Sequence, residues 1–101
     1  MSYRVISSKR FLKTVKKHKH SGKEQILQDL EAVVDLLALH DTRSLFVLYE
    51  RWRDHPLKGD RQGVRELHVS MDDLLLYRVD EGTATIKLLD IVNHEELRKK
   101  R

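Results

Sequence analysis

Apolar side chains in the first part of the chain repeat first with the period of a strand and then with that of a helix. Residues 3–6 alternate and include β-branched side chains, which predicts a short strand. Ser7 or Ser8 then stands where a helix cap is expected, so we predict a helix that begins near Lys9. The apolar side chains that share one face of this helix are Phe11, Leu12 and Val15.

A second helix is predicted directly after the first. Ser21 and Glu24 have the spacing of a capping box, and Gly22 between them helps the chain reverse its direction. One apolar stripe then continues with helical spacing to about Leu39, and it is formed by Ile26, Leu27, Leu30, Val33, Val34 and Leu37. The two helices therefore form a hairpin whose apolar faces need a surface to cover.

The pattern between His40 and Gln62 is irregular, and this segment is long for a connection in so small a domain. We therefore predict a functional loop here. Several apolar residues are expected to fix part of the loop to the core, namely Leu45, Phe46, Leu48, Tyr49 and Trp52.

Strand-like runs follow at residues 64–69, 74–79 and 83–91. Between the last two runs, residues 80–82 suit a tight hairpin in which Gly82 supplies a positive φ. The predicted element order is therefore β-α-α-β-β-β. This order predicts an α+β fold, a two-layer sandwich in which the helix hairpin packs on one face of a largely antiparallel four-stranded sheet.

The chain of 101 residues is expected to form one domain with one modest core. No apolar run reaches the ~20 residues of a membrane span, and the first residues lack the apolar segment of a signal peptide. We therefore predict a cytoplasmic protein without membrane contact. Because the sequence has no cysteine, disulfides, thiolate nucleophiles and sulfur metal ligands are excluded.

The net charge of +4 is unevenly distributed along the chain. Basic residues gather in the first predicted helix and again in residues 98–101. Lys9, Lys13 and Lys16 recur with helical spacing away from the apolar face of that helix. This distribution favours a polyanionic partner, with nucleic acid as the natural candidate, although basic helices are often only solvated faces.

Residues suited to chemistry concentrate at and after the segment Asp54-His55-Pro56-Leu57. Pro56 fixes its own φ and biases His55 toward an extended conformation, so His55 should occupy a defined place. The ends of the predicted strands can bring several proton-handling groups to one open side of the sheet. These groups are His55, His68, Asp72 and His94, and the neighbouring cations are Lys58, Arg61 and Arg65.

Such a set suits the cleavage of RNA by the neighbouring 2′-hydroxyl. Imidazoles titrate near neutrality and can accept or donate a proton, while cationic side chains stabilise a phosphorane-like transition state. One histidine would deprotonate the 2′-hydroxyl, another would protonate the 5′-oxygen, and Arg65 would hold the phosphate. No metal or other cofactor is required. Strict strand alternation would place Arg65 and His68 on opposite faces, unless a bulge or the strand end intervenes.

Other interpretations of the histidines stay open. Each imidazole taken alone is more often a hydrogen-bonded surface residue. Two histidines and a carboxylate can also bind zinc, but the spacing lacks a tight pair such as H-x-x-x-H. The remaining histidines lie among helix ends and charges, and we interpret His18, His20 and His40 as solvated.

Four segments of the second half carry a family resemblance, namely 54–59 (DHPLKG), 63–69 (GVRELHV), 72–77 (DDLLLY) and 93–97 (NHEEL). They resemble the bacterial YafQ branch of the RelE/ParE toxin superfamily, whereas the first half resembles it only by its helix hairpin. The resemblance implies a type II toxin that cleaves mRNA in the ribosomal decoding site and is silenced by an antitoxin. By position, the family's catalytic histidines and aspartate match His55, His68, Asp72 and His94, and a basic position that faces the RNA matches Arg65.

The sequence departs from the family pattern in two places. An aromatic residue usually follows the last histidine closely and stacks on a base, whereas Leu97 and Arg98 stand here. The turn that often carries a proline and an aromatic residue reads Ser-Met-Asp-Asp at residues 70–73. Asp73 could therefore take the acidic role in place of Asp72, which the alignment favours.

The leading interpretation is a metal-independent, ribosome-dependent endoribonuclease, and its implied partners are an antitoxin, the 16S rRNA of the ribosome and mRNA. The antitoxin complex is also a candidate for binding operator DNA. We expect RNA contacts at Lys58, Arg61, Arg65 and Arg98, and ribosome contacts at Lys9, Lys13 and Lys16. The alternatives are a non-catalytic ParE-like gyrase inhibitor and a plain RNA- or ribosome-binding domain. Neither alternative needs several imidazoles at these positions.

Overall fold

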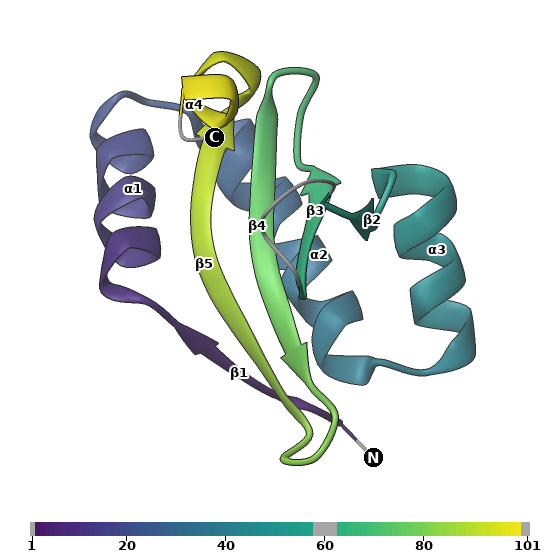
Figure 1. Cartoon of the computed structure of the whole chain (residues 1–101). Coiled ribbons are helices and arrows are strands. Elements are labelled where there is room, and N and C mark those ends of the chain that lie inside the picture. Colours follow the sequence, from purple (N-terminus) through teal and green to yellow (C-terminus); the bar gives the residue numbers. More distant parts are fainter. Residues whose placement is uncertain (1, 58–62, 100–101) are drawn as a thin grey trace.

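The computed structural model describes residues 2–57 and 63–99 of the chain (Figure 1). Its elements in chain order are β1 (Arg4–Ser7), α1 (Lys9–His20), α2 (Glu24–Leu39), α3 (Thr42–Trp52), β2 (His55–Pro56), β3 (Val64–His68), β4 (Asp73–Asp80), β5 (Thr85–Asn93) and α4 (His94–Lys99). The strands form a five-stranded sheet with the order β1-β5-β4-β3-β2. β1 runs parallel to β5, and the other neighbours are antiparallel. The predicted α+β fold is confirmed, although the sheet is mixed and gains the short strand β2.

The core lies between the sheet and the helices α1, α2 and α3. Side chains alternate between the two faces of a strand, so Leu67 of β3 and Tyr77 of β4 point to the helix side, where they join Leu37 and Leu48. A smaller cluster occupies the opposite face, where Leu97 of α4 covers part of the sheet. Its members are Leu57, Val64, Leu74, Leu76, Val92 and Leu97. Within the described ranges, no helix is both long and apolar enough to cross a membrane.

The prediction of an irregular loop between His40 and Gln62 is wrong for much of that segment, because α3 lies within it. The Asp41 side chain starts this helix by accepting a hydrogen bond of 2.7 Å from the backbone N–H of Ser44. Leu48 is completely buried and Trp52 packs against the core, as predicted, whereas the predicted anchors Leu45, Phe46 and Tyr49 are exposed. Phe46 and Tyr49 keep 60% and 65% of their surface exposed.

Of the two helix caps predicted from the sequence, one is confirmed and the other is wrong. Ser8 does cap α1, since its Oγ accepts a hydrogen bond from the N–H of Phe11. Ser21 forms no capping box with Glu24, because its hydroxyl donates back to the Lys17 carbonyl and ends α1 instead.

The predictions for the Leu12 side chain and for the β4–β5 turn are also wrong. Leu12 is 56% exposed and does not share the buried face of Phe11. In the β4–β5 hairpin the positive φ of 49° belongs to Ala84, whereas Gly82 has no positive φ. The reversal between α1 and α2 does use a glycine, because Gly22 has a φ of 73°.

Candidate active site

His55 is held on both sides of its ring. It follows the left-handed turn at Arg53, which ends α3, and it pairs directly with Glu66 across β2 and β3. Its Nδ1 lies 2.6 Å from the Arg53 carbonyl oxygen, and its Nε2 lies 2.6 Å from Oε1 of Glu66. A carbonyl oxygen only accepts hydrogen bonds, so Nδ1 carries a proton. With Glu66 ionised, the arrangement suits a doubly protonated imidazolium.

His68 and His94 continue the row of imidazoles. His68 ends β3 and shares a face with Glu66, two residues earlier, while His94 is the first residue of α4. The ring centroids of His55 and His68 are 6.2 Å apart, and those of His68 and His94 are 5.6 Å apart. The strand ends therefore bring the three predicted histidines together on the open face of the sheet.

The surroundings of His68 favour its neutral form. Partial burial lowers the pKa of His68, because desolvation penalises the imidazolium. The Glu66 carboxylate opposes this shift, while the positive charges of His94, Arg53 and His55 add to it. Burial and these neighbouring charges therefore disfavour the imidazolium form of His68 relative to the neutral ring.

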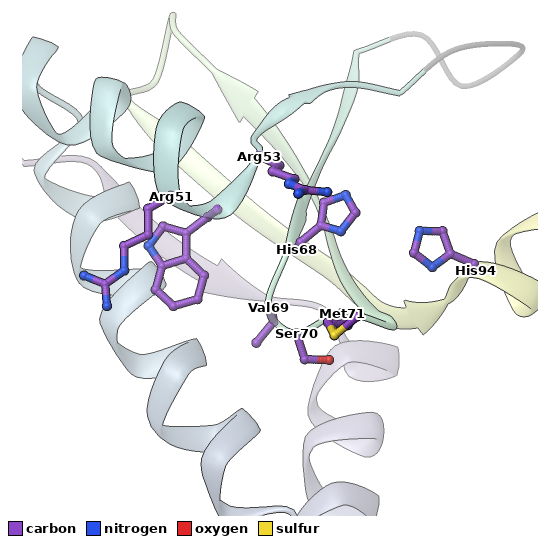
Figure 2. A pocket seen from close by; sticks show the side chains of 8 residues that line it. Arg51, Arg53, His68, Val69, Ser70, Met71 and His94 are labelled. Carbon is purple, nitrogen blue, oxygen red and sulfur yellow. The ribbon is translucent and has the colours of Figure 1, made fainter.

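A pocket of about 500 Å³ opens beside this row (Figure 2). Its lining comes from the end of α3, the end of β3 with the following turn, and the start of α4. The lining residues are Arg51, Trp52, Arg53, His68, Val69, Ser70, Met71 and His94. His68 and His94 thus belong both to the row of imidazoles and to the lining of the pocket, and Arg53 adds a cation beside them.

Arg65 does not belong to this site, so the expectation that it flanks the same cleft is wrong. Its Nη2 donates a 3.0 Å hydrogen bond to Oδ2 of Asp54, which is 5% exposed. The Tyr77 hydroxyl donates to the other oxygen of the same carboxylate. β3 pairs with β4 without a bulge, so strict alternation directs Arg65 to the helix side and His68 to the open side. Burial raises the pKa of Tyr77, and the adjacent Asp54 carboxylate raises it further.

The two candidate aspartates occupy different positions. Asp73 begins β4, and its carboxylate accepts a 2.8 Å hydrogen bond from the Ser70 hydroxyl, which closes the β3–β4 turn. Asp72 is exposed on that turn and does not line the pocket. Asp73 therefore has a structural partner, and the assignment of the acidic role to Asp72 stays a prediction.

Comparison with known proteins identifies the family. The sequence model of one protein family, the bacterial toxin of type II toxin-antitoxin system, YafQ, matches residues 3–99. The chain belongs to the YafQ family of toxins. No curated protein sequence matches it significantly.

Solved structures agree with this assignment. A metal-bound toxin from Helicobacter pylori is 33% identical over 94% of this chain and 98% of its own, with a TM-score of 0.79. The Escherichia coli DinJ-YafQ toxin-antitoxin complex contains a chain that is 24% identical, with 96% and 98% coverage and a TM-score of 0.76. The YafQ-type fold therefore extends over almost the whole of this toxin.

Two residues of the site in this YafQ-family toxin were not predicted from the sequence. Glu66 binds His55, and the available signal was its position two residues before His68, which places both on one face of β3. Arg53 lines the pocket and lies two residues before His55. Its side chain reaches the site because the backbone turns there with a φ of 53°, which the sequence does not reveal.

The remaining predicted cations divide into two groups. Lys58 and Arg61 lie outside the described residues, as does the side chain of Arg98 in α4. Lys9, Lys13 and Lys16 are all exposed on α1. Among the residues that the structure describes, no three histidine, aspartate or glutamate side chains are grouped so that they could hold a metal ion.

Proposed function

We propose that this toxin is an endoribonuclease that cleaves mRNA on the ribosome by attack of the 2′-hydroxyl on the adjacent phosphate. The observation that carries the proposal is the row of His55, His68 and His94 on the open face of the sheet, with centroid spacings of 6.2 and 5.6 Å. Two of them can therefore reach different oxygens of one phosphate.

The chemical environment of each ring supports a separate role. His68 is the general base, because its lowered pKa keeps a lone pair free to take the 2′-hydroxyl proton. His94 is exposed at the start of α4, and as an imidazolium it donates a proton to the leaving 5′-oxygen. The bond between phosphorus and the 5′-oxygen breaks as the bond to the 2′-oxygen forms. The products are a 2′,3′-cyclic phosphate and a 5′-hydroxyl.

Negative charge on the phosphate is countered by His55 and Arg53. His55, held by Glu66 and the Arg53 carbonyl, suits a fixed imidazolium that stabilises the developing negative charge. Arg53 takes the phosphate-binding role first expected of Arg65. Asp72, with its exposed carboxylate on the turn after His68, is kept as the proposed acidic residue.

The proposed partners follow from the family and from the surface charge. A type II toxin is paired with an antitoxin, and the Escherichia coli relative has been solved as the DinJ-YafQ complex. We propose a cognate antitoxin for this chain, and an antitoxin complex that binds operator DNA. The exposed lysines of α1 would contact the phosphate backbone of 16S rRNA.

Expression without the antitoxin tests the proposal. We expect growth arrest and cuts in ribosome-bound messages that end in 2′,3′-cyclic or 3′-phosphate, mapped by sequencing transcript ends. Intact messages with inhibited DNA supercoiling would instead support a gyrase inhibitor. Intact messages with ribosome binding alone would support a plain binding domain.

The metal-free mechanism has its own test. Both proton transfers can be supplied by imidazoles, so we propose that no bound metal takes part. Elemental analysis of the isolated toxin should find less than stoichiometric zinc or copper. Stoichiometric metal whose removal abolishes cleavage would overturn this part of the proposal, and the imidazoles would then be reassigned as ligands.

A further inference from the structure

The pocket beside His68 and His94 has features that phosphate chemistry alone does not require. Neither His55 nor Glu66 lines it. Its volume of about 500 Å³ falls within the range of small-molecule sites. A phosphate held between His68 and His94 would direct one of its attached nucleosides into this space.

The apolar part of the lining comes from Trp52 and Met71. Met71 is 91% exposed at the tip of the β3–β4 turn, so it contributes nothing to the core. The turn that carries it is fixed, because the Ser70 hydroxyl bonds the Asp73 carboxylate at 2.8 Å and accepts from the Asp73 N–H at 3.1 Å. Methionine packs readily on aromatic faces. The fold therefore presents an adaptable apolar side chain at the rim of the pocket.

Trp52 forms the other wall of the pocket. It is half-buried and packs against the main core, so its ring is held by the fold while part of it still faces the pocket. The Arg51 guanidinium lies 5.7 Å from the ring centroid. This distance is near the outer limit of about 6 Å for a cation–π contact, so an arriving ligand can displace the exposed Arg51 side chain at little cost.

Polar groups that could read the edge of a base are scarce here. The Ser70 hydroxyl is already engaged with Asp73, and Val69 is buried. The cations Arg51 and Arg53 suit phosphates, which position a nucleic acid without reading its sequence. Leu97, near the C-terminus, is only 7% exposed and cannot face a base. Stacking is therefore the interaction that this lining offers to a base.

We propose that this pocket is a stacking subsite for one unpaired nucleobase of single-stranded RNA next to the scissile phosphate, with Trp52 as the platform and Met71 as the cover. The proposal rests on the ribonuclease function, because that function supplies the RNA. Stacking on an aromatic side chain tolerates every base. The subsite should consequently contribute affinity for a base with little preference among the four.

The single tryptophan of the chain makes the subsite directly observable. The probes are a fluorescein-labelled 2′-O-methyl adenosine tetramer, which cannot be cleaved, and an abasic tetramer with the same phosphates. We expect the adenosine tetramer to bind about 5- to 150-fold more tightly, as measured by anisotropy. It should also quench Trp52 fluorescence, and the abasic tetramer should not.

Variants assign the effect to these side chains. Trp52→Leu, which keeps an apolar group against the core, and Met71→Ser should each reduce the advantage of the adenosine tetramer. Phe46→Leu is the matched control, because Phe46 is an exposed aromatic residue of α3 that does not line the pocket. If Trp52→Leu fails to fold by circular dichroism, Met71→Ser and the quenching of the parent protein still decide the question.

Equal affinity for the two tetramers, or binding of neither at millimolar concentration, overturns the subsite. Binding of the adenosine tetramer without quenching also overturns it, because the base would lie elsewhere. The assay involves no cleavage, so its result is separate from the ribonuclease proposal. A toxin that stacks the base but never cuts mRNA would refute the ribonuclease and keep the subsite. One that cuts mRNA with the same KM after Trp52→Leu and Met71→Ser would refute only the subsite.

Discussion

Arg65 and Glu66, adjacent on β3, bind two adjacent residues of the segment before them from opposite faces of the sheet. Arg65 donates to the buried Asp54 carboxylate at 3.0 Å on the helix side, and Glu66 lies 2.6 Å from Nε2 of His55 on the open side. Both residues of the pair Asp54-His55 are therefore fixed by side-chain contacts. The helix-side ion pair supports the position of the imidazole without touching the site.

The first prediction separates the roles of Arg65 and Arg53. Arg65→Ala should lower the free energy of unfolding by about 2–4 kcal/mol, because it leaves the buried Asp54 carboxylate without its cation. We expect a smaller loss of stability than for a fully buried ion pair, because about a third of the Arg65 side chain is in water. Urea denaturation measures the loss, and Arg10→Ala on the exposed surface of α1 should stay within about 0.5 kcal/mol of the parent.

Kinetics provide the complementary measurement. Arg53→Ala should leave stability nearly unchanged and lower the rate at saturating ribosome, because its cation lies at the proposed phosphate site. If Arg65→Ala were as stable as the parent and slower at saturating ribosome, Arg65 would act on the phosphate despite its position.

The second prediction concerns the protonation of His68. A carbon-detected NMR titration of the histidine rings should give His68 a pKa below the ordinary value of 6.5. Arg53→Gln removes a positive charge that disfavours the imidazolium, so the pKa of His68 should rise. Glu66→Gln removes the negative charge that favours the imidazolium, so the pKa should fall further. Shifts of the same sign in both variants would contradict this account of the site.

Sequence patterns located the histidines but not all of their surroundings. His55, His68 and His94 stand at strand or helix ends, and the order of elements suffices to bring such ends to one side of a sheet. The side reached by Arg65 depends on whether β3 contains a bulge, and the sequence does not encode that visibly. Arg53 was missed because its place depends on one left-handed backbone turn.

The same limit applies to the fold. The long amphipathic helix α2 and the antiparallel strands have clear periods, and their prediction was confirmed. α3 is less evident, because exposed Phe46 and Tyr49 obscure the spacing of the buried residues Ser44 and Leu48. The two-residue strand β2 is too short to have any period, and it forms only because β3 offers it a partner.

The third prediction tests the proposed general acid. His94→Ala should lower the rate of mRNA cleavage by about 10²–10⁴-fold, the usual contribution of a general acid or base. His94 is exposed, so the circular dichroism spectrum and the melting temperature should not change. His20→Ala, an exposed histidine of α1 outside the site, is the matched control and should cut at the parental rate. Equal activity of the two variants would remove His94 from the mechanism.

The last prediction concerns the lysines of α1, which we propose contact the ribosome and take no part in the cleavage reaction. Lys9, Lys13 and Lys16 are exposed and recur with helical spacing, so together they present one stripe of positive charge. Replacing all three by glutamate should weaken ribosome binding and reduce the slope of log affinity against log salt, because fewer phosphate contacts release fewer counterions. The rate of the bound toxin should stay nearly the same, since none of the three lines the pocket. Glu24, Asp29 and Asp35 of α2 are already acidic, so they cannot serve as control sites for a change to glutamate. The control is therefore Gln28→Glu on the exposed side of α2, which should change the binding much less. Filter binding at several salt concentrations measures the affinity for ribosomes and its salt dependence. If the triple variant binds ribosomes as tightly as the parent at each salt concentration, these lysines are a solvated face, and ribosome contact must be sought elsewhere on the toxin.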